Sequence, residues 1–117
     1  MALSFFLGIL LLLSTTHALS AMKRILVTGG NKGIGKAICE RLLTEWPNDT
    51  YVLLGARDAA RGQAAVEELV AKLGCGDRLS MLELDTNSDE SVEKAAAQVK
   101  GDGEPLYGII NNAGVRA

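Results

Sequence analysis

The glycine-rich stretch "TGGNKGIG" at residues 28–35 limits the fold more than any other part of this 117-residue chain. It follows the apolar run "RILV" directly and leads into a segment whose apolar residues recur at helical spacing. A glycine turn between a strand and a helix opens a strand–helix–strand unit. The free N–H groups at the start of such a helix bind phosphate. The stretch therefore predicts an α/β fold with an anion-binding first turn.

Downstream, short apolar runs alternate with helical patterns. Strands are expected at 24–28, 50–56 and 78–85, and a fourth strand within 106–114 runs into a loop. Helices are expected at 33–45, at 59–73 behind an N-cap at Asp58, and from Ser88 to the break "GDGEP" at 101–105. This alternation gives right-handed crossovers and a parallel sheet. We therefore predict an α/β Rossmann half-domain over residues 22–117, with four parallel strands in the order 3-2-1-4 and helices on both faces.

Each predicted helix has an apolar side that should pack on the sheet. These sides are Ile34, Ala37, Ile38, Leu42 and Trp46 in the first helix, Val66, Leu69, Val70 and Leu73 in the second, and Val92, Ala95, Ala96 and Val99 in the third. The strand order leaves the fourth strand at an open edge, so Ile109 or Ile110 should have an apolar face without a partner. Self-association through that strand is a further expectation.

Composition excludes several classes of function. The chain is 48% hydrophobic and 22% charged with a net charge of −2, so it has no basic surface for nucleic acid. His17, the only histidine, lies outside the predicted domain, and Cys39 and Cys75 lack the spacing of a zinc site. No metal site is expected. No disulfide is expected either, because one cysteine lies in a helix and the other in a separate turn.

Residues 1–21 are predicted to be a signal-like hydrophobic leader. The apolar stretch at 2–13 is shorter than the ~20 residues that cross a bilayer, so no membrane span is expected. Thr16 and Ala18 stand as in a signal-peptidase site, which predicts the secretory pathway. The first basic residues follow the apolar stretch instead of preceding it, however, and translation from Met22 would give a cytoplasmic protein. Both compartments stay open.

Two phosphate-binding patterns fit the glycine letters. A P-loop needs Gly, four residues, Gly, Lys and then Ser or Thr, and Gly30, Gly35 and Lys36 match it. Ala37 stands where the hydroxyl would bind Mg²⁺. That substitution argues against a P-loop nucleotide-binding protein.

The other pattern is a variant of the dinucleotide fingerprint. It reads Thr-Gly, three residues, Gly, one residue, Gly, and is carried by Thr28, Gly29, Gly33 and Gly35. The glycines allow the tight turn, the approach of backbone to a pyrophosphate, and close packing of helix on strand. The N–H groups of Gly33 and Ile34 would face the pyrophosphate. This pattern favours a dinucleotide cofactor.

The end of the second predicted strand indicates which dinucleotide is bound. An Asp or Glu there would accept a hydrogen bond from the ribose 2′-OH of NAD, but "LLGARD" places Arg57 at this position. A guanidinium suits the 2′-phosphate of NADP, and Lys32 in the glycine loop adds a second positive charge. Asp58 is explained by its capping position. The two cations therefore favour NADP(H).

Four segments, "TGGNKGIG", "ARDAARGQAA", "LELD" and "NNAG", resemble the short-chain dehydrogenase/reductases, and the first two are most similar to the NADPH-dependent carbonyl reductases. The resemblance covers residues 23–116. It implies transfer of a hydride from NADPH to a ketone or aldehyde. It also implies the surroundings of the cofactor: Asn31, Lys32 and Arg57 at the 2′-phosphate, Asp85 and Thr86 at the adenine, and Asn112, Ala113 and Gly114 at the nicotinamide ribose. Asn111 would tie the fourth strand to its neighbours.

The catalytic residues of that family are not found in these letters. The family uses a Ser and a Tyr-x-x-x-Lys pair, whereas Tyr51 and Tyr107 are followed four positions later by Gly55 and Asn111. Both tyrosines are interpreted as packing residues. The 117 residues are therefore expected to bind cofactor without reducing a carbonyl. A stand-alone NADP-binding or dimerising module is the alternative function.

Overall fold

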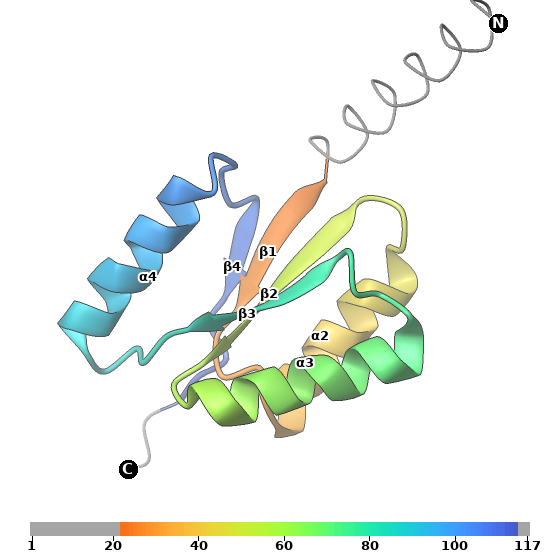
Figure 1. The fold of residues 1–117 in the computed structure, drawn as a ribbon, viewed down its shortest axis with the longest axis horizontal. Coiled ribbons are helices and arrows are strands. Elements are labelled where there is room, and N and C mark those ends of the chain that lie inside the picture. The colour runs from red at the N-terminus through yellow and green to blue at the C-terminus, as the bar shows by residue number, and fades with distance from the viewer. Residues whose placement is uncertain (1–21, 115–117) are drawn as a thin grey trace, which may run out of the picture.

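The computed structural model describes residues 22–114, so the predicted leader lies outside the described part of the chain. Its elements are β1 (Lys23–Val27), α2 (Gly33–Glu45), β2 (Thr50–Ala56), α3 (Ala59–Leu73), β3 (Leu79–Glu83), α4 (Asp89–Gly101) and β4 (Gly108–Ile110). Figure 1 shows a central sheet with α2 and α3 on one face and α4 on the other. None of the helices between residues 22 and 114 has the length and hydropathy to cross a membrane.

The four strands are parallel and lie in the order β3-β2-β1-β4, which confirms the predicted topology. The third strand is shorter than predicted, and the fourth occupies only the middle of its predicted stretch. β3 ends at Glu83, although the N–H of Leu84 still donates to the carbonyl of Ala56 at 2.9 Å. β4 spans only 108–110 because the chain turns back toward β1 after Ile110.

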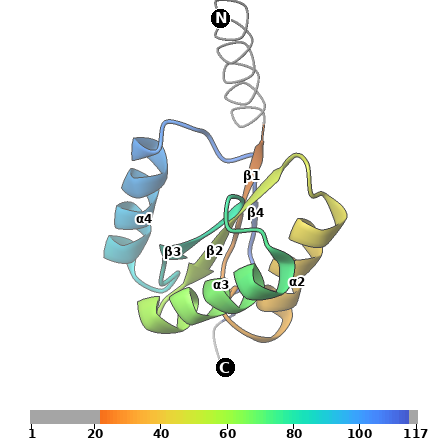
Figure 2. The same ribbon diagram turned by 45° about the vertical axis from the view of Figure 1, so that its right-hand side comes forward.

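The side chains of β1 and β2 alternate between two cores, as expected of strands covered on both faces. Val27, Val52 and Leu54 pack with the helices α2 and α3. Leu26 and Leu53 point to the opposite face, where α4 lies. Figure 2 shows the sheet between these two helical layers.

The buried side of α2 differs from the prediction. Gly35, Cys39 and Leu43 are its buried residues, at the i, i+4 and i+8 positions of one stripe. Ile34 precedes this stripe by one residue, about 100° of helical turn, and its side chain is 75% exposed. Trp46 ends the helix and is half exposed. Ala37 is exposed as well, so the prediction of a packed side was wrong for Ile34, Ala37 and Trp46.

The N-cap predicted at Asp58 is confirmed, and the C-terminus of α3 and the N-terminus of α4 have regular caps as well. The Asp58 carboxylate accepts a hydrogen bond from the N–H of Arg61 at 3.0 Å, and Gly74 ends α3 in the left-handed conformation at φ 67°. Ser88 caps α4, because its hydroxyl accepts from the N–H of Ser91 at 3.2 Å.

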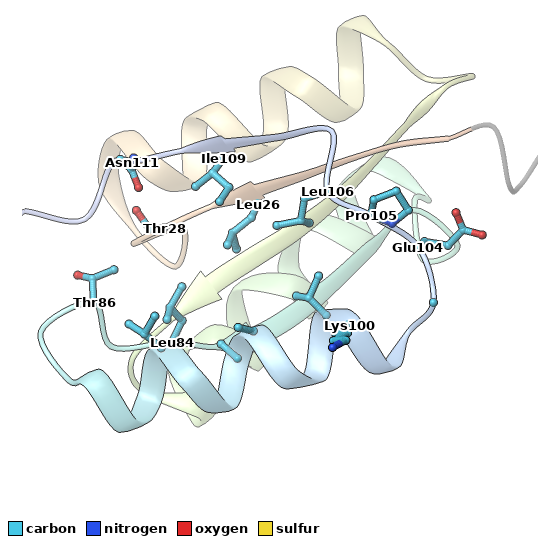
Figure 3. Close-up of a pocket in the computed structure, with 15 residues that line it drawn as sticks. Leu26, Thr28, Leu84, Thr86, Lys100, Glu104, Pro105, Leu106, Ile109 and Asn111 are labelled. Carbon is cyan, nitrogen blue, oxygen red and sulfur yellow. The ribbon is translucent and has the colours of Figure 1, made fainter.

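The apolar side of α4 is only partly covered. Ala95 is buried, but Val92 is 43% exposed and Ala96 is also exposed, which corrects the predicted buried stripe. Between α4 and the strands β1 and β4 lies an apolar groove of about 600 Å³, into which Leu26 and Ile109 point (Figure 3). The helix borders this groove instead of packing fully on the sheet.

β4 is an edge strand, and its exposed apolar side chains follow from that position. Ile109 is 53% exposed, as predicted. Tyr107 is 67% exposed, so it is not a packing residue of the core; its ring instead lies 5.1 Å from the Lys23 ammonium. The N–H of Tyr107 donates to the carbonyl of Arg24, and the Arg24 guanidinium donates to Glu104 O and pairs with Asp102. These contacts hold the start of β4 against β1.

Cys39, in α2, and Cys75, after α3, are free thiols, and both are buried in the core that these helices form with the sheet. Burial raises the pKa of the Cys39 thiol to about 12 and also raises the pKa of Cys75. Both groups are therefore neutral thiols at physiological pH, and they behave as small apolar core residues.

The ends of β1 and β4 are joined by one buried hydroxyl. Thr28 Oγ1 accepts hydrogen bonds from the N–H groups of Asn112 at 2.9 Å and Ala113 at 3.0 Å. The Asn112 side-chain amide donates to the carbonyl of Gly29 at 3.2 Å. Because Thr28 itself is 3% exposed, water cannot replace these bonds easily.

We predict that Thr28→Val lowers the free energy of unfolding by about 1–3 kcal/mol, because the N–H of Ala113 loses its acceptor and the N–H of Asn112 keeps only the carbonyl of Ile110, while the side-chain shape is kept. Urea denaturation measures this change. Thr28→Ser is the matched control, since it keeps the hydroxyl and removes one methyl, at a cost of about 1 kcal/mol. Wild-type stability in Thr28→Val would contradict the role of the hydroxyl.

Candidate functional site

A cleft of about 520 Å³ lies at the carboxyl ends of the strands. This is where ligands bind in open parallel α/β sheets. The residues that line it include most of those singled out in the sequence: Gly29, Asn31, Lys32, Gly33, Arg57, Asp85, Thr86, Asn112, Ala113 and Gly114. The fold thus brings four separate segments of the chain to one cavity.

The glycines of the first turn have two distinct functions. Gly29 and Gly33 have positive φ angles of 62° and 58°, a region that side chains disfavour. Gly35 is required for space instead, because a Cβ there would lie 2.1 Å from the carbonyl oxygen of Gly29. The first turn of α2 therefore packs directly against the loop that leaves β1.

The start of α2 offers unpaired N–H groups to the cleft. The first backbone hydrogen bond of this helix runs from Lys36 N–H to Lys32 O, so the N–H groups of residues 33–35 have no partner within the helix. Lys32, the N-cap residue, supplies no side-chain acceptor, and the first turn contains no acidic residue. This end of the helix is suited to an anion.

Two cations border the same cleft. Lys32 and Arg57 are exposed, and within residues 22–114 neither forms an ion pair with a carboxylate. The adjacent carboxylate of Asp58 is engaged as the cap of α3 and does not line the cleft. The charge at this end of the cleft is therefore positive.

The opposite wall is formed by the connection from β3 to α4. Asp85 is partly buried, and its Oδ1 accepts a hydrogen bond from the N–H of Asn87 at 3.0 Å. Its own N–H donates to the Ser91 hydroxyl at 2.8 Å. A carboxylate oriented in this way can accept a further hydrogen bond from a ligand.

Three predicted site residues do not line the cleft. Thr28 is buried beneath it, Gly35 packs under the glycine loop, and the side chain of Ile34 is exposed to solvent. Thr28 and Gly35 shape the cleft from below.

The resemblance had also assigned to Asn111 the contact that holds the fourth strand. Asn111 is exposed and borders the apolar groove. The hydrogen bonds that make this contact come from Thr28 and Asn112, so the assignment to Asn111 was wrong.

Leu84 and Asn87 line the cleft and were missed in the sequence. Leu84 falls within the predicted strand at 78–85, and Asn87 lies between that strand and the predicted helix from Ser88. Their position beside Asp85, at the carboxyl end of a predicted strand, was the signal that could have identified them.

The structure also weighs against a P-loop. Lys36, which would have to reach the phosphates, pairs with Glu68 of α3 and lies outside the cleft. The hydrogen bond from Lys36 lowers the pKa of the Glu68 carboxyl. In the described residues, no group of three His, Cys, Asp or Glu side chains is placed to hold a metal ion.

Comparisons with known proteins agree with this geometry. The family model of the short chain dehydrogenases matches residues 23–117. Carbonyl reductase (NADPH) 1 of Pongo abelii is 42% identical over 82% of this chain and 33% of its own length.

Two solved structures are also similar. Menthone neomenthol reductase from Mentha piperita has a TM-score of 0.74 at 35% identity, over 80% of this chain and 32% of that one. The NADPH bound carbonyl reductase from chicken fatty liver has a TM-score of 0.67 at 32% identity, over 82% of this chain and 36% of that one.

The chain spans about a third of the length of the curated relatives that it matches. The matched part includes the glycine turn, the cleft and all the described strands. The chain therefore belongs to the short-chain dehydrogenase family.

Proposed function

We propose that the cleft binds NADP(H) and that the chain supplies the cofactor-binding part of a carbonyl reductase-like oxidoreductase. The observation that carries this proposal is the pair of exposed cations, Lys32 and Arg57, beside the unpaired N–H groups of α2. A dinucleotide with an additional phosphate has one anionic group for the two cations and another for the N–H groups of α2. The relatives named after NADPH support the same choice of cofactor.

Each wall of the cleft has a role in this proposal. The N–H groups of Gly33 and Ile34 would hold the pyrophosphate, and Arg57, Lys32 and Asn31 would hold the 2′-phosphate. Asp85 would accept from the adenine amino group beside Thr86. The segment at 112–114 would border the nicotinamide ribose.

The bound cofactor would supply a hydride for a ketone or aldehyde. Reduction also needs a proton donor, and the 117 residues contain no Tyr-x-x-x-Lys pair. Neither Tyr51 nor Tyr107 lines the cleft. These residues therefore bind and orient the cofactor, and we expect no carbonyl turnover from them on their own. A stand-alone NADP-binding module would have the same cleft.

We predict at least tenfold tighter binding of NADPH than of NADH by the full chain, because hydrogen bonds between charged groups contribute about 1.5–3 kcal/mol. Titration of the reduced cofactors by fluorescence measures both affinities. Arg57→Asp should remove most of the difference.

Arg41→Asp provides the matched control for that experiment. Arg41 is an exposed arginine of α2 that pairs with Glu45 and lies outside the cleft, so this variant should keep the preference for NADPH. Equal wild-type affinities for NADPH and NADH would contradict the assignment of NADP(H). Tight binding of ATP–Mg²⁺ would favour a P-loop function.

We also propose that the chain associates with a second copy through β4. Only β1 pairs with this strand among the described residues, so its outer edge has backbone donors and acceptors for another strand. Ile109 is half exposed at that edge, and the apolar groove beside it extends the apolar surface. Burial of such a side chain favours association by about 1.5–3 kcal/mol.

We predict dimers or larger species in sedimentation experiments at micromolar concentration. Ile109→Lys should shift the population toward monomer, because a charge at a strand edge opposes pairing. Trp46→Lys is the control. It also replaces an exposed apolar side chain with a charge, but Trp46 lies at the C-terminal end of α2 and not in β4. A wild-type monomer across the concentration range would contradict association through this edge.

A last proposal concerns the leader. We propose that residues 1–21 are removed as a secretory signal, since their apolar stretch and small-residue site fit a signal peptidase. Expression in a secretory host should give a mature N-terminus near Leu19 or Met22, as determined by mass spectrometry. A cytoplasmic product that retains Met1, or that starts at Met22, would contradict secretion.

A further inference from the structure

A serine outside the cleft is hydrogen-bonded to the residue that forms the adenine-side wall. Ser91 lies in the first turn of α4, and its hydroxyl accepts from the backbone N–H of Asp85 at 2.8 Å. The N–H of Ser91 donates in turn to the Ser88 hydroxyl, and the N–H of Ser88 donates to the carbonyl of Asp85. The connection from β3 to α4 is thus closed by a ring of hydrogen bonds.

The backbone of Asp85 depends on this ring of hydrogen bonds because Asp85 lies beyond the end of β3. The last backbone link to β2 is made by Leu84, whose N–H donates to Ala56 O. The backbone N–H of the next residue, Asp85, finds its acceptor in a side chain of α4 and not in a strand. Without the Ser91 hydroxyl, the backbone N–H of Asp85 would lose its acceptor, and only the bond from Ser88 N–H to the Asp85 carbonyl would hold this backbone.

The carboxylate of Asp85 is also oriented for recognition. Its Oδ1 accepts from the N–H of Asn87, and no described residue donates to Oδ2. A carboxylate oxygen in a cleft accepts from an amino group and is repelled by a carbonyl oxygen. The orientation of Asp85 can therefore distinguish a 6-aminopurine from a 6-oxopurine.

We propose that Ser91 is a positioning residue that acts through Asp85 and gives the cleft its preference for adenine over hypoxanthine. This inference rests on the proposed binding of NADP(H). Ser91 is not among the residues that line the cleft, so its effect on the ligand must pass through the backbone of Asp85.

Ser91 could act only by stabilising α4, or it could position Asp85. A comparison with Ser88 separates these two roles. Both serines stabilise the start of α4, Ser88 as its N-cap and Ser91 through its link to the preceding loop. Ser88→Ala removes the cap but leaves the Ser91 hydroxyl in place. Loss of helix stability alone should therefore affect both variants, whereas loss of base preference should be confined to Ser91→Ala.

The test compares the affinities of the full chain for NADPH and for its hypoxanthine analogue by cofactor fluorescence. Wild type should bind NADPH about tenfold more tightly than the analogue, because one hydrogen bond to a carboxylate changes affinity by about that factor. Asp85→Ala should remove the preference, and Ser91→Ala should reduce it to about twofold. Ser91→Thr, which keeps the hydroxyl, and Ser88→Ala should both retain it. Thermal melting of each variant reports the change in stability separately.

Three results would overturn parts of this picture in distinguishable ways. An unchanged preference in Ser91→Ala would remove the positioning role. An equal loss in Ser91→Ala and Ser88→Ala would assign Ser91 a structural role only. Failure of wild type to bind either dinucleotide would instead overturn the proposed function, and the inference with it.

Discussion

The first turn of α2 packs on the end of β1 so closely that only a glycine fits between them. A Cβ at Gly35 would lie 2.1 Å from the carbonyl oxygen of Gly29. Because the helix starts this near the strand, its unpaired N–H groups lie beside the cleft at the carboxyl end of the sheet. The carbonyl of Gly29 also accepts the Asn112 side-chain amide, so the same turn fixes the end of β4. Both the anion-binding end of the cleft and the part of its lining formed by residues 112–114 depend on this packing of Gly35 against Gly29.

The parts of the fold that could be predicted from the sequence are those specified by local signals. The glycine turn, the N-cap at Asp58 and the helix start near Ser88 each depend on signals within a few residues, so they mark the ends of elements without knowledge of the tertiary structure. The strand order follows from chain connectivity and the handedness of the crossovers. That order also places Arg57, Asp85 and the glycine loop around one cleft. Their contacts with a cofactor stay predictions.

What could not be predicted depends on contacts between elements. α2 has apolar residues on more than one side, and the packing of Gly35 decides that Cys39 and Leu43 are buried while Ile34 is exposed. Similarly, the letters "NN" do not show which asparagine contacts β1. Asn112 does so because the chain turns toward the Thr28 hydroxyl after β4, and this turn is stabilised by a residue 84 positions away.

The weak packing of α4 explains why its polar links matter. Its apolar residues Val92 and Ala96 are exposed beside the groove, so burial contributes less to its placement than it does for α2 and α3. A helix with few buried side chains depends more on the hydrogen bonds at its ends. Those bonds join it to Asp85, in a connection whose Leu84 and Thr86 line both the groove and the cleft. The position of α4 and the shape of the cleft wall are therefore coupled through this connection.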